Sequence, residues 1–127
     1  MKSRRLILTL QEQETQYMAN EIKELMHEID AFTQERDWDQ FHNPKDLAVA
    51  LSIEASELLE AFLWKQPEDA KIEKVKEELA DVFNYALLIA SKYNFDVAEI
   101  VREKLEKNAR KYPVEKARGV ATKYNEL

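Results

Sequence analysis

Cysteine is absent from this chain of 127 residues, and glycine and proline are scarce, with one and three residues. The lack of cysteine excludes disulfides, thiolate metal sites and a cysteine nucleophile, and it fits a reducing compartment. With one glycine there is no Gly-rich phosphate-binding loop, which excludes a P-loop enzyme. No apolar run approaches the roughly 18 residues of a membrane span, so we expect no membrane segment.

An excess of positive charge is also missing, since the formal net charge is −6. Nucleic-acid binding relies on clustered Lys and Arg against phosphates, so we expect no nucleic-acid partner. The start "MKSRRLILTL" is similar to the basic beginning of a signal peptide, but its apolar part stops at Leu10 and meets "QEQE". That run is too short for a signal sequence, and we expect a cytoplasmic protein.

What the chain does contain favours helix, because Glu, Lys, Leu and Ala dominate its composition. Its length suits one domain, residues 1–127, with an arm at 1–12 and a polar tail at 114–127. Apolar residues recur three and four apart in segments that predict helices, namely 13–36, 44–64, 70–93 and 97–111. The predicted fold is all-α, an antiparallel four-helix bundle.

Several helix ends can be read from single residues. Asn43 followed by Pro44 is a strong start signal, with Asn as N-cap and Pro at the first helical position. Pro67 pushes Gln66 out of the helical region and ends the second helix. Asn94 suits a left-handed C-terminal position, and Asp96 suits the N-cap of the fourth helix.

Two helices place carboxylates on their apolar faces. The expected apolar stripe of the second helix, Leu47, Leu51, Leu58 and Phe62, includes Glu54, with Glu57 beside it. The third helix carries Glu78 and Asp81 at the same three-residue spacing, among Val75, Val82 and Tyr85. If the two helices pack together, all four carboxylates converge, and such a cluster is costly unless a cation neutralises it.

A hard divalent ion fits this arrangement, because carboxylate oxygens suit Mg²⁺, with Mn²⁺ as a possible substitute. The alternative is a solvated acidic face on a non-catalytic helical interaction module, since acidic pairs arise often in a chain with 25 acidic residues. No Glu-x-x-His pair is present, which argues against a di-iron bundle. Metal ions that clamp a phosphate and activate a water need no His or Cys nucleophile.

The spacing of Glu54-x-x-Glu57 and Glu78-x-x-Asp81 resembles the carboxylate motif of the MazG-like all-α NTP pyrophosphatases. The dCTP pyrophosphatase branch is similar over four stretches, "ERDWDQFHNPKDLAVALSIEASELLEAFLW" (35–64), "EELADVFNYALLIA" (77–90), "KLEKNARKYP" (104–113) and "ARGVATKY" (117–124). The resemblance implies Mg²⁺-dependent hydrolysis of a nucleoside triphosphate to monophosphate and pyrophosphate, in nucleotide-pool sanitation. It also implies that these four carboxylates are the metal ligands and the catalytic centre.

The same resemblance implies further substrate-binding residues, which are Trp38, Phe41, His42, Trp64, Tyr85, Lys104, Asn108 and Arg110. The aromatic ones would contact the base and those of the fourth helix the phosphates. The alternatives are a hydrophobic closure of the loop at 38–42, a cap on the bundle end for Trp64, a buried core tyrosine for Tyr85, and cations that complement a helix C-terminus.

Base preference is open, because Ile29 stands where members of that branch can carry a pocket histidine. A cytosine nucleotide is the first expectation, and a modified base or a regulator that binds nucleotide without turnover are the alternatives. The resemblance also implies a homo-oligomer, with a tetramer (a dimer of dimers) favoured over a dimer. The tail, with Arg118, Lys123 and Tyr124, would then fold over a neighbouring subunit's site.

Overall fold

The computed structural model describes residues 7–127, apart from the side chains of residues 18 and 19. The first half of the predicted arm, 1–6, lies outside the described residues. The chain divides into two units, Met1–Phe95 and Asp96–Leu127, which are described separately below. The single-domain organisation predicted from the sequence stays a prediction.

Helices account for all the regular structure of the described residues, and the all-α prediction is confirmed. The α-helices are α1 (Leu10–Glu35), α2 (Pro44–Glu60), α3 (Ile72–Lys92), α4 (Val97–Lys111) and α5 (Val114–Ala117). Short 3₁₀ turns are η1 (Asp39–Phe41), η2 (Pro67–Asp69) and η3 (Tyr124–Glu126). None of the described helices combines the length and hydropathy that a membrane span needs.

The first helix begins three residues earlier than predicted, at Leu10, because Thr9 forms a capping box with Glu12. The Thr9 hydroxyl accepts the Glu12 N–H at 3.2 Å, and the Glu12 carboxylate accepts the Thr9 N–H at 2.7 Å. Two helix-end donors are satisfied in this way, so the end of the expected arm is helical. The interpretation of residues 10–12 as arm is therefore wrong.

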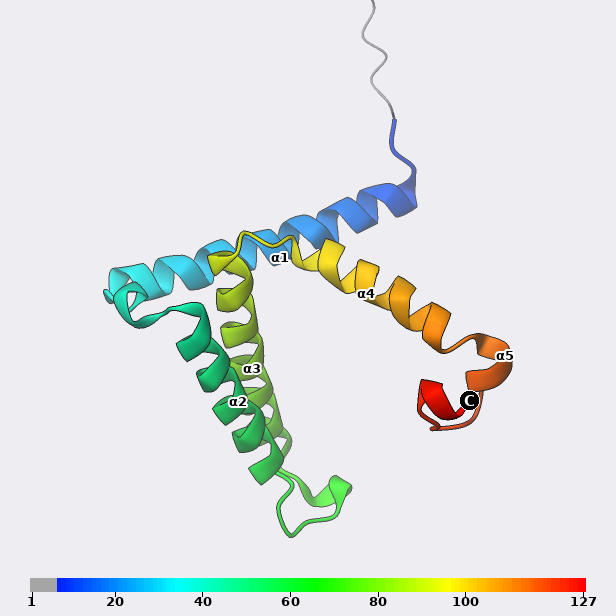
Figure 1. Ribbon diagram of the computed structural model, residues 1–127. Helices are drawn as coiled ribbons and strands as arrows, with labels where there is room; N and C mark the ends of the chain where they lie inside the picture. The colour runs from blue at the N-terminus through cyan, green and yellow to red at the C-terminus, as the bar shows by residue number, and fades with distance from the viewer. Residues whose placement is uncertain (1–6) are drawn as a thin grey trace, which may run out of the picture. The chain divides into compact units, whose positions relative to one another are not determined.

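Helices α2 and α3 lie side by side as an antiparallel pair, and α1 packs across α3 (Figure 1). Asn43 caps α2 as predicted, with its side chain accepting the Asp46 N–H at 2.9 Å. The predicted end of α2 at Trp64 is wrong, because α2 stops at Glu60 and 3₁₀-type turns follow. These turns bring Trp64 to a left-handed φ of 61°, outside the helical range.

The buried core of the first unit lies between these helices, and its apolar members are Leu47, Ala61, Leu87, Leu88 and Ala90. The spacing of Val75, Leu79 and Val82 predicts all three on the apolar face of the third helix, but Leu79 is 41% exposed. Its chain neighbour Glu78 is 5% exposed and faces the helix pair instead. Helix α3 therefore buries the Glu78 carboxylate and leaves the Leu79 side chain partly exposed.

The second unit contains α4, which has its predicted bounds and is capped by Asp96, whose side chain accepts the Glu99 N–H at 3.0 Å. The tail predicted at 114–127 contains α5 and η3. Tyr124 in η3 meets the Tyr112 ring edge to face at 6.1 Å. The spacing of Ile100, Val101 and Leu105 predicts a buried side for α4, and this prediction is wrong, because all three residues are exposed.

Candidate metal and nucleotide site

Carboxylates from α2 and α3 converge where the two helices pack. Glu54, Glu78 and Asp81 each offer one oxygen, and these atoms all lie within 4.8 Å of one another. Glu57 lies beside them, since its side chain hydrogen-bonds with both Glu54 and Glu78. The convergence expected from the two three-residue spacings is therefore present.

Two oxygens in this cluster lack a hydrogen-bond partner among the described residues, namely Oε2 of Glu54 and Oε2 of Glu78. Both atoms are buried, and buried carboxylate oxygens are normally paired because losing water is costly. Glu78 itself is 5% exposed. A site with orphaned oxygens from neighbouring carboxylates is one that a cation would complete.

The electrostatics of the cluster favour neutralisation. Burial raises the pKa of Glu54 to about 7, helped by the hydrogen bond that its protonated form donates to Glu57 and by the charges of Glu57, Asp81 and Glu78. Burial, and then the nearby carboxylates, also raises the pKa of the Tyr85 hydroxyl. Without a cation, the protein therefore holds Glu54 partly protonated at neutral pH.

One cation of the chain already contacts the cluster. The Lys74 ammonium pairs with Oε1 of Glu78, one helical turn away on α3. The hydrogen bond from Lys74 lowers the pKa of Glu78 in spite of its burial, and the same bond raises the pKa of Lys74. Lys74 therefore occupies one oxygen of Glu78 and leaves the other, Oε2, without a hydrogen-bond partner among the described residues.

A divalent ion fits these residues. The donors are all carboxylate oxygens, which suit Mg²⁺ or Mn²⁺ and do not suit soft metals that prefer thiolates. The orphaned oxygens of Glu54 and Glu78 and the nearby Asp81 carboxylate would hold it.

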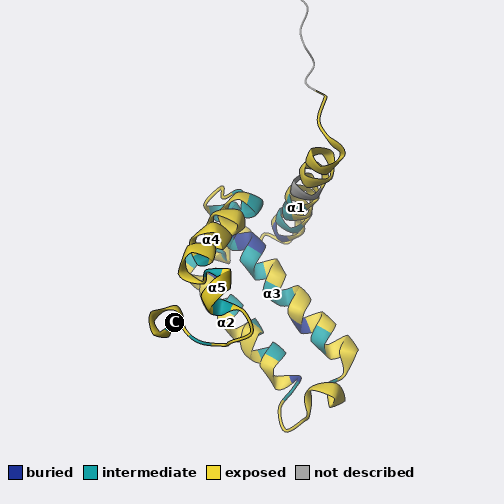
Figure 2. Ribbon diagram, turned by 90° about the vertical axis from the view of Figure 1, so that its right-hand side faces the viewer, coloured by how far each residue is buried: buried dark blue, intermediate teal, exposed yellow. Residues whose placement is uncertain are grey.

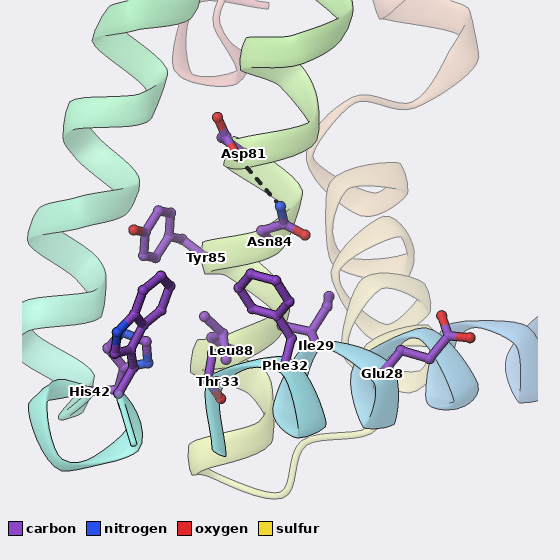
Figure 3. A pocket seen from close by; sticks show the side chains of 10 residues that line it. Glu28, Ile29, Phe32, Thr33, His42, Asp81, Asn84, Tyr85 and Leu88 are labelled. Carbon is purple, nitrogen blue, oxygen red and sulfur yellow. Dashed lines mark hydrogen bonds between the residues drawn. The ribbon is translucent and has the colours of Figure 1, made fainter. Parts of the chain in front are cut away.

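A pocket of about 400 Å³ opens next to the cluster and shares Asp81 with it (Figure 3). Its lining comes from α1, the loop after it, and α3, and consists of Glu28, Ile29, Phe32, Thr33, Trp38, His42, Asp81, Asn84, Tyr85 and Leu88. Aromatic and aliphatic walls with a few polar groups are typical of small-molecule sites.

The polar groups of the pocket differ in whether they already have a hydrogen-bond partner. Nδ1 of His42 is buried without a hydrogen-bond partner in the described part of the chain. The Thr33 hydroxyl already donates to the Asp30 carbonyl of its own helix at 2.9 Å. Asn84 donates to Asp81 over a long 3.5 Å contact. His42 and Asn84 are therefore the more available groups for a ligand.

The loop between α1 and α2 brings Trp38 and His42 to the pocket. Asp37 turns the chain with a φ of 55°, and the Trp38 N–H donates to the Thr33 carbonyl at 3.0 Å. The Trp38 ring meets Phe32 at 5.8 Å and 73°, an edge-to-face geometry. The Lys92 ammonium of α3 pairs with Oδ1 of Asp39 in this loop at 2.5 Å. This contact lowers the pKa of Asp39.

Comparison with known proteins agrees with this geometry. The model of the MazG-like family matches residues 49–127. The chain belongs to the MazG-like family. The family predicted from the carboxylate motif is thus confirmed.

Named relatives of this MazG-like chain are dCTP pyrophosphatases. It is 38% identical to dCTP pyrophosphatase 1 of Bos taurus in an alignment of 104 positions that covers 76% of this chain and 62% of that protein. It is 39% identical to dCTP pyrophosphatase 1 of Rattus norvegicus, over 76% of this chain and 61% of that protein. The chain thus spans less than two thirds of the length of these curated relatives.

A solved pyrophosphatase from Archaeoglobus fulgidus is also similar, with 40% identity and a TM-score of 0.66. The match covers 73% of this chain and 93% of that one. The all-helical fold is therefore shared with a known structure.

The predicted site residues divide into three groups. Trp38, His42 and Tyr85 line the pocket. Phe41 is 63% exposed and Trp64 is 94% exposed, and neither lines it. Lys104, Asn108 and Arg110 lie on α4 in the second unit, with Asn108 half-buried and the two cations exposed. A substrate role for all three groups stays a prediction.

Sequence reasoning missed several pocket residues of this MazG-like chain. Asn84 stands three residues after Asp81 on α3, a spacing that places both on one side of the helix. Thr33 follows Ile29 by four residues on α1 and is 5% exposed. A polar residue within an apolar stripe was the signal for both, and it is the same signal that revealed Glu54 and Glu78.

Proposed function

We propose that this chain, residues 1–127, is one MazG-like domain that hydrolyses nucleoside triphosphates to monophosphates and pyrophosphate with Mg²⁺. The substrate would be dCTP or a related or modified nucleotide, and the role would be sanitation of the nucleotide pool. The observation that carries the proposal is the meeting of Glu54, Glu78 and Asp81 at the rim of the 400 Å³ pocket. The names of the similar dCTP pyrophosphatases support the choice of substrate.

In this proposal Glu54, Glu57, Glu78 and Asp81 hold the metal and form the catalytic centre. Bound Mg²⁺ would supply a Lewis acid for phosphate oxygens and lower the pKa of a coordinated water. The buried oxygens of Glu54 and Glu78, which lack partners among the described residues and come from different helices, would help to hold the ion and so position the phosphates. An all-carboxylate centre needs no nucleophilic side chain.

The pocket would take the base. The Trp38 ring offers a face for stacking, and the unpartnered Nδ1 of His42 offers a polar contact to a base edge. Tyr85 stands between pocket and carboxylates. Ile29 in the lining supports a binding mode that relies on apolar contact at that wall.

The proposal also includes the predicted substrate-binding residues that do not line the pocket. Lys104, Asn108 and Arg110 would contact phosphates, and Phe41 and Trp64 would contact the base of the nucleotide. The exposure of Trp64 supports a contact with a site on another copy of the chain.

Self-association is supported by exposed apolar residues of α2 and α3, namely Val49, Ile53 and Phe83. Figure 2 shows exposed residues along both helices. Clustered exposed apolar groups are typical of interfaces. We extend the proposal to a cytoplasmic homo-oligomer, with a tetramer favoured over a dimer. Light scattering of the purified protein would give the subunit number.

The decisive experiment measures pyrophosphate released from a panel of NTPs and dNTPs with Mg²⁺. We expect release from dCTP, and a loss of at least about 100-fold in Glu78→Gln, because the amide is a poor ligand for a hard cation. Glu60→Gln, on the exposed side of α2, is the matched control and should keep activity. A panel with no release above the Glu78→Gln background would refute the enzyme.

Two alternatives give different results in the same preparation. A non-catalytic interaction module would show the same Mg²⁺ affinity before and after Asp81→Asn. A nucleotide-binding regulator would bind dCTP without releasing pyrophosphate. Calorimetric titration with Mg²⁺ and with nucleotide distinguishes the two.

A further inference from the structure

The functional groups of α3 follow one another along a single face of the helix. Lys74, Glu78, Asp81 and Tyr85 are spaced by four, three and four residues, which keeps them on one side. The pocket uses only the later part of this face, from Asp81 to Leu88. The order along the helix is therefore pocket, carboxylates and then Lys74.

This order matches the order of parts in a nucleoside triphosphate. With its base in the pocket and its α-phosphate at the carboxylates, the β- and γ-phosphates continue toward Lys74. Seven residues separate Asp81 from Lys74, or about 10 Å along the helix axis. A lysine at that place would meet the phosphates that leave as pyrophosphate.

Lys74 forms an ion pair, yet its side chain remains half-exposed to solvent. Its ammonium pairs with Oε1 of Glu78, which is buried, while the Lys74 side chain is 52% exposed. A half-exposed lysine can turn on its flexible four-carbon stem without disturbing the core. The pairing gives the buried Glu78 a positive partner in the protein without metal.

We infer that Lys74 binds the β- and γ-phosphates of the substrate, and that its pairing with Glu78 is the resting position of the empty site. The inference rests on the proposed function and adds a residue to it. With the negative charge of the cluster offset by a bound cation, Glu78 would attract Lys74 less strongly. The ammonium then turns to the phosphate tail, whose charge it offsets as pyrophosphate departs.

The experiment compares two ligands that differ only in the proposed contact. One is dCMP, which lacks the β- and γ-phosphates. The other is α,β-imido-dCTP, which has them and cannot be cut between the α and β positions. Binding of each with Mg²⁺ is measured by calorimetry for the wild type, Lys74→Met, Lys74→Arg and Lys76→Met. Lys76 is the matched control, an exposed lysine two residues along the same helix.

We expect Lys74→Met to weaken binding of α,β-imido-dCTP at least about tenfold, because a charge-assisted contact to phosphate is lost. Binding of dCMP should stay within about twofold, since dCMP does not reach residue 74. Lys74→Arg should keep most of the affinity, and Lys76→Met should match the wild type. Pyrophosphate release from dCTP by Lys74→Met should show a raised KM.

Three results would overturn the inference. These are equal weakening of both ligands in Lys74→Met, no weakening of either, or the same loss in Lys76→Met. A wild type that releases pyrophosphate beside such a result would leave the proposed function standing without Lys74. A wild type that binds the analogue through Lys74 but releases nothing would refute the hydrolase and keep the phosphate contact.

Discussion

Replacing Glu54 by glutamine tests the metal centre through the stability of the protein without metal. Burial and the neighbouring carboxylates raise the pKa of Glu54 from 4.5 to about 7. The folded protein therefore keeps a proton on Glu54 in a pH range where the unfolded chain has released it. Glutamine has the same shape, carries no charge and still offers hydrogen bonds, so it removes only the cost of ionisation.

The size of the effect follows from the two pKa values. A difference between 4.5 and about 7 corresponds to at most about 3 kcal/mol of stability. Solvent at the partly exposed site screens part of this, and we expect about 1–2 kcal/mol. Since the folded state binds the extra proton, wild-type stability falls as the pH rises from about 4.5 to about 7. Above pH 7 the full penalty is present.

The assay is urea unfolding in EDTA between pH 4.5 and 8.5. Glu54→Gln should be more stable than the wild type at pH 8, and the gain should disappear toward pH 5. Glu60→Gln is the control, because Glu60 is exposed on the same helix. This substitution removes the same charge as Glu54→Gln. Its unfolding free energy should follow the wild type at every pH within about 0.5 kcal/mol.

With Mg²⁺ we expect the wild type to become the more stable of the two proteins. The wild type should gain stability as Mg²⁺ is added, since an ion that binds only the folded state stabilises it. Glu54→Gln should gain much less, because one ligand oxygen is weaker. Equal pH profiles for the two proteins in EDTA, or equal gains with Mg²⁺, would refute the view of Glu54 as a strained ligand.

Two further changes test the parts that position the site. Asn43→Ala removes the N-cap of α2 and should lower the unfolding free energy by about 1 kcal/mol, read by urea unfolding; an unchanged midpoint would contradict the cap. Lys92→Met releases the loop held through Asp39 and should raise the nucleotide KM about threefold with kcat unchanged, in the pyrophosphate assay; a fall in kcat alone would contradict a positioning role.

Much of the fold could be predicted from local signals. Asn43 and Asp96 cap their helices as expected, and Asn94 has the left-handed φ of 53° that its place after α3 suggested. The start of α1 was missed because the capping box of Thr9 and Glu12 lies within a segment interpreted as an arm. The end of α2 was missed because no Gly or Pro stands between Glu60 and Trp64.

The candidate site was predicted where polar residues interrupt apolar stripes. The carboxylates of Glu54, Glu78 and Asp81 meet because α2 and α3 pack on the faces that carry them. The pocket was only partly foreseen, since its walls combine α1, α3 and the loop with Trp38. Which residues of separate helices meet depends on packing, and no local pattern records it.

The strongest sign of function in the fold is that α3 buries Glu78 and exposes its neighbour Leu79. Turning the helix toward Leu79 would bury a leucine and release a carboxylate to water, both of which favour stability. The structure instead leaves Leu79 41% exposed and Glu78 5% exposed. Breaks of the burial rule of this kind are expected at functional sites, where stability is given up for chemistry. The pairing of Glu78 with Lys74 offsets part of this cost, and a cation in the cluster would offset more, so metal binding and folding should be coupled in this protein.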